Sequence, residues 1–467
     1  MRDADPGRAA REITAAITAL LDPDRVASAS ANIARALADS GVTFEGRTVG
    51  VSLFPSVFHA GDVVQLERRT RLVREVLMRV IQRFRTEHHE RQYDGPLHRA
   101  FAPYEPWWDA IASERRALPE IGLMRYDFII EAPGVWSVLE TNTACPGGTT
   151  ICASVRDAWL GCGPIGDVAA VFDVLRFPVD DPTSFVRYLY QTACHAAGAD
   201  DPGIAVLNDS ASLTFELDLW ASQHERLRRA GVVKGDFLVA DIRDVEVVRG
   251  RAWVRGTEVA LIHNKVNPIE VRPSDPAVAG WLEASRTPGV AFLNSMGAMY
   301  LTEAKRVLQL ICMPEIRRLL AVSPEEAAAI DALMPSTEVI PARGEPGANK
   351  VLARLEQDRE ALVIKPDART RGQGVYLGRT VPPDQWTARI DETRQHFGVA
   401  QRALHVPQAA RVDLSDGTVR IAQEYFGADV YYFGDRFAGL SSRAHTHPVF
   451  NMGAGGTLRP VLVVRPR

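Results

Sequence analysis

Lysine is rare in this chain of 467 residues, although lysine and arginine together number 54. A chain that fills its basic surface with arginine keeps lysine where a compact point charge is needed, so each lysine carries more information than usual. A lysine on a helix surface is still the commoner case. The lysines are Lys234, Lys265, Lys305, Lys350 and Lys365.

Cysteine is also sparse, with five residues and neither a Cys-x-x-Cys pair nor a Cys and His spacing typical of metal ligands. Neither a disulfide framework nor a zinc site is therefore indicated. No apolar run approaches the roughly 18 residues of a membrane span, and no signal-peptide pattern is present. With a formal net charge of -4, nothing indicates a polyanionic partner. We predict a reduced, cytoplasmic protein that binds neither nucleic acid nor membrane.

The composition, 46% hydrophobic and 24% charged, is that of an ordinary globular protein. The chain is too long for one core and is expected to hold two to four domains. Apolar residues at helical spacing predict a helix over 63–85, and a helix that carries Lys305 is expected over 301–320. The aromatic segment 101–108 is either a loop that faces substrate or a buried brace between domains.

The block 175–290 has the pattern of a small doubly wound domain. A buried strand is expected at 204–207, a helix at about 213–229 and a second strand at 237–240, which together make a βαβ unit of a parallel sheet. No glycine-rich dinucleotide fingerprint follows the first strand, so the block does not read as a nicotinamide site.

The most informative stretch, 125–148, reads RYDFIIEAPGVWSVLETNTACPGG. Apolar and polar residues alternate on both sides of a break at 133–134, which predicts a β-hairpin whose polar side chains share a face. Oxygen-bearing side chains of this kind suit Mg²⁺, which takes one or two carboxylates together with substrate phosphates. A surface hairpin with ordinary charges is the alternative, but Asp, Glu and Asn are poor strand formers. The side chains expected to meet are Arg125, Asp127, Glu140 and Asn142.

A second informative stretch, 361–378, contains a strand that ends at Lys365, then a basic, glycine-rich loop and a return strand. Backbone N–H groups of such a loop approach phosphate oxygens closely, and the ammonium group neutralises them. The Walker pattern GxxxxGK[ST] is absent, and an ordinary hairpin tip would explain the stretch about as well. The loop residues of interest are Arg369, Arg371, Gly372 and Gly374.

The strand IAQEYF at 421–426 is interpreted as the hinge of a nucleotide cleft, where the backbone meets the adenine edge. Glu424 would accept hydrogen bonds from the nucleotide, with Gln423 and Tyr425 beside it.

Near the end of the chain, Arg443 is expected on a strand that precedes the glycine loop NMGAGG at 451–456. A substrate or phosphate would lie against the backbone of this loop, at Asn451, Gly455 and Gly456. His445 and His447 share a strand face at a spacing that can bind metal, but no further ligand is nearby, so a structural or substrate contact is favoured.

These stretches together resemble the ATP-grasp superfamily of carboxylate–amine ligases. Lys305 and the VIKP segment with its hairpin resemble the two nucleotide lysines, QEYF resembles the hinge, and NMGAGG resembles the glycine loop of glutathione synthetase-type members. RYD followed by Glu140 and Asn142 resembles the magnesium signature. The metal hairpin precedes the nucleotide site, which is similar to circularly permuted members such as glutathionylspermidine synthetase-like ligases. The amidase domain of some such synthetases has no counterpart here.

The resemblance implies a mixed α+β and α/β architecture. It comprises a metal hairpin with its helix at 121–165, a Rossmann-like pre-ATP-grasp domain at 175–290 and nucleotide-binding subdomains at 295–467. The resemblance leaves residues 1–120 unexplained, and we expect them to form a helical N-terminal region that contacts substrate or braces the domains. ATP and Mg²⁺ are the implied cofactors. Asp127, Glu140 and Asn142 would bind the metal, and Arg125 and Arg443 would stabilise the acyl phosphate. The implied nucleotide contacts are Lys305, Lys365, Arg371, Gly372, Gly374, Gln423, Glu424 and Tyr425.

The implied reaction is ATP-dependent amide formation that releases ADP and phosphate. We expect small carboxylate and amine substrates, amino acids or short peptides, and by analogy alone a role in bacterial secondary metabolism. A homodimer is one option for the oligomeric state. Two alternatives stay open, a kinase that phosphorylates a small molecule and a non-catalytic nucleotide-binding module.

Overall fold

The structure is a computed structural model. It describes residues 7–44, 47–115, 118–144, 146–209, 216–267, 269–342, 344–369, 372–449 and 455–465.

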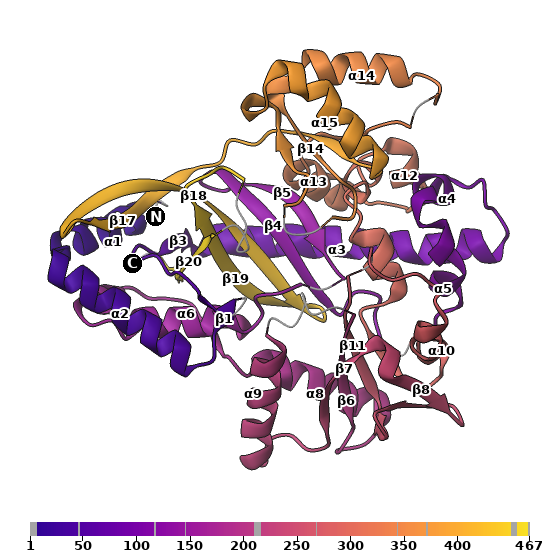
Figure 1. Cartoon of the computed structure of the whole chain (residues 1–467), viewed down its shortest axis with the longest axis horizontal. Coiled ribbons are helices and arrows are strands. Elements are labelled where there is room, and N and C mark those ends of the chain that lie inside the picture. The colour runs from indigo at the N-terminus through magenta and orange to yellow at the C-terminus, as the bar shows by residue number, and fades with distance from the viewer. Residues whose placement is uncertain are drawn as a thin grey trace.

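The centre of the molecule is an antiparallel sheet that combines strands from the first third and the last part of the chain (Figure 1). Its strand order is β20-β19-β18-β4-β5, and β17 pairs with the first half of β18. The predicted hairpin is therefore found, and it lies beside strands that follow it by almost 300 residues. The strands are β4 (Leu123–Ala132), β5 (Val135–Asn142), β17 (Gln408–Ser415), β18 (Thr418–Phe433), β19 (Arg436–His445) and β20 (Thr457–Arg459).

The longest helix, α3 (Ala60–His89), packs against this sheet and includes the helix predicted over 63–85. The hydroxyl of Tyr126 on β4 donates to the carbonyl of Thr70, and the Thr70 hydroxyl lies 2.8 Å from that of Tyr432 on β18. Apolar residues at helical spacing make the buried face because they follow one side of the helix. They include Val73, Val76, Leu77, Val80 and Ile81.

A second hydrophobic core lies at one end of the central sheet, where the two ends of the described chain come together (Figure 1). The helices there are α1 (Arg8–Leu20), α2 (Pro23–Asp39), α6 (Ile151–Leu160) and α7 (Pro164–Asp167). Two strands of this region, β1 (Thr43–Phe44) and β2 (Arg47–Thr48), pair with each other. The last strand, β21 (Val461–Val464), pairs in parallel with β3 (Ser56–His59).

The predicted βαβ unit is part of a four-stranded parallel sheet of order β12-β11-β6-β7. The strands are β6 (Ile204–Asn208), β7 (Phe237–Asp241), β11 (Leu261–Lys265) and β12 (Ala291–Leu293). Three helices accompany them, α8 (Ser184–Ala197), α9 (Leu217–Arg229) and α10 (Ala279–Arg286). Between β7 and β11 the chain forms a separate antiparallel sheet of β8 (Val245–Val248), β9 (Arg251–Val254) and β10 (Thr257–Val259).

The single helix expected over 301–320 is wrong. The structure has a π-helical turn at Ala298–Thr302, a turn that carries Lys305, and then α11 (Val307–Leu310) and α12 (Pro314–Leu319). Pro314 suits the first turn of a new helix because it lacks the N–H that continues an old one. The break is held from outside the segment, because the backbone N–H of Arg306 donates to a carboxylate oxygen of Asp367.

A small subdomain above the central sheet contains the strand that ends at Lys365 (Figure 1). Its sheet has the order β13-β16-β14-β15, and a separate core lies between that sheet and two helices. The elements are β13 (Thr337–Val339), α14 (Ala348–Gln357), β14 (Leu362–Lys365), β15 (Tyr376–Leu377), α15 (Pro383–Gln395) and β16 (Val399–Arg402). α13 (Pro324–Leu333), which begins with a capping box at Ser323 and Glu326, leads into it.

Three aromatic side chains of the segment 101–108 are buried, those of Phe101, Tyr104 and Trp107, which favours the interpretation as a brace. The segment forms a 3₁₀ turn at Ala102–Trp107 between α4 (Pro96–Ala100) and α5 (Trp108–Ser113). Trp107 stacks on Tyr300 with ring centroids 4.1 Å apart. No helix in the described part of the chain has both the length and the apolar character needed to cross a membrane.

Candidate active site

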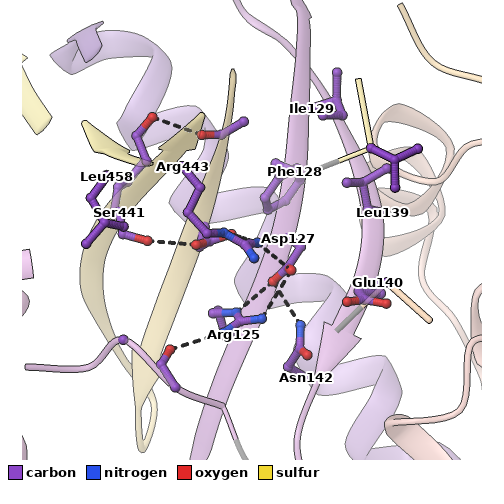
Figure 2. A pocket seen from close by; sticks show the side chains of 18 of the residues that line it. Arg125, Asp127, Phe128, Ile129, Leu139, Glu140, Asn142, Ser441, Arg443 and Leu458 are labelled. Atoms are coloured by element: carbon purple, nitrogen blue, oxygen red, sulfur yellow. Dashed lines mark hydrogen bonds and ion pairs between the residues drawn. The ribbon is translucent and has the colours of Figure 1, made fainter. Parts of the chain in front are cut away.

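The polar side chains of the hairpin lie opposite one another, as the alternation predicts (Figure 2). Arg125 pairs in register with Asn142, and Asp127 pairs with Glu140. A register shift follows Asp127, at the point where the polar pairs give way to apolar ones. The hairpin thus presents a polar patch at one end and an apolar surface at the other.

Asp127 is the centre of this patch and is surrounded by donors. Arg125 binds it through two nitrogens, with Nε 2.7 Å from Oδ1 and Nη2 3.1 Å from Oδ2. Arg443 Nη2 lies 2.6 Å from Oδ2, and Asn142 Nδ2 donates to Oδ1 at 2.8 Å. Burial opposes ionisation of Asp127, but the two guanidinium groups outweigh it and lower the pKa of this carboxyl to about 2.

Arg443 bridges Asp127 to a second buried carboxylate, Asp429, at 2.5 Å. Asp429 lies on β18 directly opposite Asp127, and it accepts a hydrogen bond from Ser441. Burial raises the pKa of Asp429, and Asp127 adds to this rise, while Arg443 opposes it. Arg443 Nε is buried and has no hydrogen-bond partner among the described residues, so this arginine keeps one donor for an anion.

Lys305 reaches the hairpin from the turn after the π-helical segment. Its Nζ lies 3.0 Å from Glu140 Oε2 and donates to the carbonyl of Arg369 at 3.1 Å. Burial disfavours the ammonium, but Glu140 outweighs this and raises the pKa of Lys305. Glu303, two residues earlier, holds the end of β5 by accepting from the N–H groups of Thr143 and Ala144.

Lys365 differs from Lys305 because its direct partners are neutral. Its Nζ donates to Gln401 Oε1 at 2.7 Å and to the carbonyl of Leu139 at 3.1 Å. Burial is the main influence, and it lowers the pKa of Lys365 to about 8, although Glu140 opposes the change. The ammonium is charged near neutral pH and has no bonded carboxylate, so its charge is available to a ligand.

One cavity of about 320 Å³ joins the hairpin to both lysines. Its walls change character along the hairpin (Figure 2). At one end the lining is apolar, with Ile129, Leu139, Val363, Leu377 and Leu404. Next come the Leu139 carbonyl with Lys365 and Glu140 with Lys305, and then Asp127 and Arg125, whose Nη1 donates to the Gly147 carbonyl. Gly148, Arg156 and Lys265 also line the cavity. Since a strand advances about 3.3 Å per residue, Ile129 and Arg125 lie roughly 13 Å apart along β4.

A buried clamp fixes the Lys305 turn against the Lys365 strand. Arg306 Nε lies 2.6 Å from Asp367 Oδ2, and the backbone N–H of Lys305 donates to the Asp367 carbonyl. Tyr104, from the aromatic brace, donates its hydroxyl to Asp367 Oδ2 at 3.0 Å. The N-terminal region, whose role the sequence left open, therefore helps to position one of the cavity lysines.

The expected hinge needs a correction. Gln423, Glu424 and Tyr425 lie inside β18, where they pair with β17, and none of them lines the cavity. The Glu424 carboxylate is buried against Arg459 at 2.5 Å, so its oxygens are already engaged. The chain after β16 lies at the apolar end instead, through Ala403, Leu404 and Val406. A glutamate beside aromatic residues in a strand was the misleading signal.

The glycine-rich segments are placed only in part. Gly372 lines the cavity, and Gly374 has a φ of +72° with a Cβ position 2.7 Å from Pro366, so only glycine fits there. Gly455 and Gly456 do not line it. His447 donates its backbone N–H to His445 Nδ1, which is a structural contact. Arg371 and Asn451 lie outside the described residues.

The side chains around Asp127 carry the type of ligand atom that Mg²⁺ prefers. Asp127, Glu140 and Asn142 offer only oxygen ligands, which this ion takes together with water and phosphate oxygens. Glu140 has a side chain 30% exposed, whereas Asp127 must give up a present contact to bind a metal. Within the described ranges, no three His, Cys, Asp or Glu side chains form a metal-ion cluster, so such a site would depend on ligand phosphates.

No family model and no curated protein matches this sequence. Among solved structures, a glutathione synthetase-like effector from Globodera pallida is similar over 95% of this chain and 98% of that one, with a TM-score of 0.57 and 12% identity. A protein described as a gamma-glutamylcysteine synthetase, from Methylobacillus flagellatus, has a TM-score of 0.40 at 12% identity over 86% and 87%. D-alanyl-alanine synthetase A from Vibrio cholerae has a TM-score of 0.28 at 10% identity over 49% and 68%. The first likeness establishes a shared fold, whereas the TM-scores of the other two are too low to do so.

Proposed function

We propose that the chain is an ATP-dependent carboxylate–amine ligase with a circularly permuted ATP-grasp arrangement. One observation carries the proposal: the hairpin of Arg125, Asp127, Glu140 and Asn142 faces Lys305 and Lys365 across a single cavity. The fold shared with a glutathione synthetase-like protein agrees with it. A hairpin that precedes the nucleotide lysines works as well as one that follows them, because only its packing beside the sheet matters.

The change from apolar to polar lining along the cavity suggests how the nucleotide would be oriented. The adenine would lie at the apolar end near Leu404, because a flat aromatic base gains most where Ile129 and Leu139 exclude water. The triphosphate would extend toward Lys305 and Lys365, whose ammonium groups neutralise it. Mg²⁺, bound by Asp127, Glu140 and Asn142, would neutralise further phosphate charge. The γ-phosphate would then lie toward Arg125 and Arg443.

In the first step, an oxygen of the substrate carboxylate bonds to the γ-phosphorus of ATP. The bond between that phosphorus and the β,γ-bridging oxygen breaks, which gives an acyl phosphate and ADP. Catalysis of such a transfer is mostly positioning and charge neutralisation. Arg443 is suited to this task because its Nε is an unused donor. In the second step, an amine nitrogen bonds to the acyl carbon, the bond to phosphate oxygen breaks, and phosphate and a proton leave.

The test is a screen of pairs of amino acids and short peptides for ADP release, with mass spectrometry of the products. A condensed product whose mass equals the two substrates less one water supports ligation. Hydroxylamine in place of the amine distinguishes a kinase, because only an activated acyl group gives a hydroxamate. A stable phosphorylated product without hydroxamate would favour the kinase. Nucleotide binding with no substrate-dependent ADP release in the whole screen would favour the non-catalytic module.

A further inference from the structure

Lys265 is a buried cation at the cavity wall that none of the roles above uses. It is 3% exposed and lines the cavity. The nearest carboxylate oxygen, Glu216 Oε2, is 3.9 Å from its Nζ, which is beyond hydrogen-bond distance. Among the described residues, the Trp220 ring also lies close to this ammonium group, with its centroid 4.9 Å away.

The buried cations along the rest of the described cavity wall are bound more tightly. Arg156 lies 2.7 Å from Asp180, Lys305 lies 3.0 Å from Glu140, and Arg459 lies 2.5 Å from Glu424. Lys365 makes a hydrogen bond of 2.7 Å to Gln401. Burying an ammonium without close partners is costly. The loose surroundings of Lys265 therefore point to a ligand that completes its hydrogen bonds.

Glu216 is not free to supply those bonds, because it already holds the backbone of the neighbouring loop. Its Oε2 accepts from the N–H of Gly148 at 2.8 Å and its Oε1 accepts from that of Thr150 at 3.2 Å. The carbonyl of Gly147 in turn accepts from Arg125 Nη1. Lys265 is thus joined to the arginine end of the cavity through one short loop, and it lies away from the apolar end.

The topology of the parallel sheet independently marks this position. Lys265 is the last residue of β11 and pairs in register with Asn208, the last residue of β6. In the order β12-β11-β6-β7, the chain leaves β6 first toward β7 and later returns to β11 on the other side. The gap between β6 and β11 is therefore the switch point of the sheet. Open parallel sheets bind their ligands outside the carboxyl ends of strands at such a point.

We infer that Lys265 binds a carboxylate that is not the one activated by ATP. This inference rests on the proposed function and extends it to the substrate class. Either the acyl donor carries a second carboxylate, as an amino dicarboxylic acid or a peptide does, or the amine acceptor is an amino acid. A carboxylate satisfies Lys265 better than a neutral group, because a hydrogen bond between two charged partners is stronger.

The experiment is calorimetric binding in the presence of a non-hydrolysable ATP analogue and Mg²⁺, which needs no turnover. One arm compares L-glutamate with L-glutamine, which differs by one carboxylate, and the other compares glycine with glycinamide. In the wild type we expect the acid of at least one pair to bind about tenfold to a hundredfold more tightly than its amide. Lys265→Met should abolish that ratio, and Lys265→Arg should keep most of it.

Lys350→Met is the matched control, because Lys350 is exposed on α14, and it should leave the ratio unchanged. Lys265→Gln replaces the methionine variant if that variant does not fold. A ratio retained in the neutral variants, or no ratio in either arm of the wild type, overturns the inference. Affinity for the ATP analogue should stay within about threefold of wild type, because Lys305 and Lys365, the lysines that the proposed function assigns to the phosphates, are unchanged in these variants. Failure of the proposed function appears separately, as the absence of ADP release from a protein that still shows the ratio.

Discussion

At the two ends of the polar part of the cavity, the buried cations have partners of opposite kinds, charged at one end and neutral at the other. At one end, Arg125, Asp127, Asp429 and Arg443 form a closed network in which each charge has an opposite partner within 2.7 Å. At the other end, the hydrogen-bond partners of Lys365 are a carbonyl and an amide. Burial is similar, yet the pKa of Arg443 rises and that of Lys365 falls.

The difference shows which charges are part of the scaffold and which are left for a ligand. A carboxylate beside a buried cation offsets the desolvation cost and holds the cation charged, whereas a neutral partner leaves the cost in place. The arginine network is therefore preorganised before any ligand arrives. Lys365 has no such carboxylate, so an anion bound beside it would offset the desolvation cost, and the proposed phosphate role would supply that anion.

The largest expected effect is loss of the arginine end. Arg125→Lys keeps a positive charge beside Asp127 but loses the two-point contact, so the rate of substrate-dependent ADP release should fall by about 10²–10³. Glu140→Gln should lose at least as much, because it removes a carboxylate from the centre of the cavity. Arg229→Lys is the control, because the Arg229 side chain on α9 is exposed. Near-normal ADP release in folded Arg125→Lys and Glu140→Gln proteins, checked by circular dichroism, would remove both residues from the mechanism.

Loss of the positive charge of Lys365 should weaken ATP binding more than it slows the chemical step. Lys365→Met removes a charge that has no bonded carboxylate, so ATP affinity should fall about tenfold to a hundredfold, while the rate of unfolding changes little. Lys365→Arg should recover part of the affinity. Equilibrium binding of a fluorescent ATP analogue measures both. An unchanged dissociation constant in the methionine variant would mean that this lysine is only structural.

The pH dependence of ATP affinity should distinguish Lys365 from the arginine network. The pKa of Lys365 is about 8 in the free protein, and a bound phosphate would raise it. Affinity for ATP should be constant below pH 8 and fall as the pH rises through 8, by about tenfold at pH 9. Lys365→Arg should be flat over this range, because a guanidinium stays charged. Dissociation constants at pH 7 and pH 9 check this, and an equal fall in both proteins would contradict it.

The smallest expected effect concerns the clamp that ties the two lysines together. Tyr104→Phe removes the hydroxyl that donates to Asp367 but leaves Arg306 in place. The free energy of unfolding should fall by about 1–2 kcal/mol, with less than a threefold change in ATP affinity. Urea unfolding measures the first quantity, with Tyr93→Phe at an exposed position as the control. A tenfold loss of ATP affinity at unchanged stability would instead give Tyr104 a direct role in the site.

The elements of the site could be predicted where one local pattern specified them. Alternation over 125–142 indicated both strands of the hairpin and the shared face of Asp127 and Glu140, and apolar residues before Lys365 indicated its strand. The same reasoning would have found Asp429, which is also a poor strand former among good ones. Lys265 carried a signal as well, because it is one of few lysines, and three of them line the cavity.

Other features depended on partners that no local pattern reveals. The helix over 301–320 fails because Asp367, some 60 residues later, binds its backbone. The hinge was assigned to a strand whose glutamate turns out to pair with Arg459. Each error came from a segment whose conformation or role was set by a distant contact, and propensity is a weak guide there.

By itself, the sequence determined which residues form strands and which face of the hairpin is polar, because these depend on a period of two along the backbone. It also limited the cations that could serve as compact point charges, because lysine is so scarce. Only the tertiary structure decided that three lysines share one cavity with the hairpin. Lys365 meets the Leu139 carbonyl across 226 residues of chain, and such a contact follows from the packing of sheets and cores, which local periodicity does not encode.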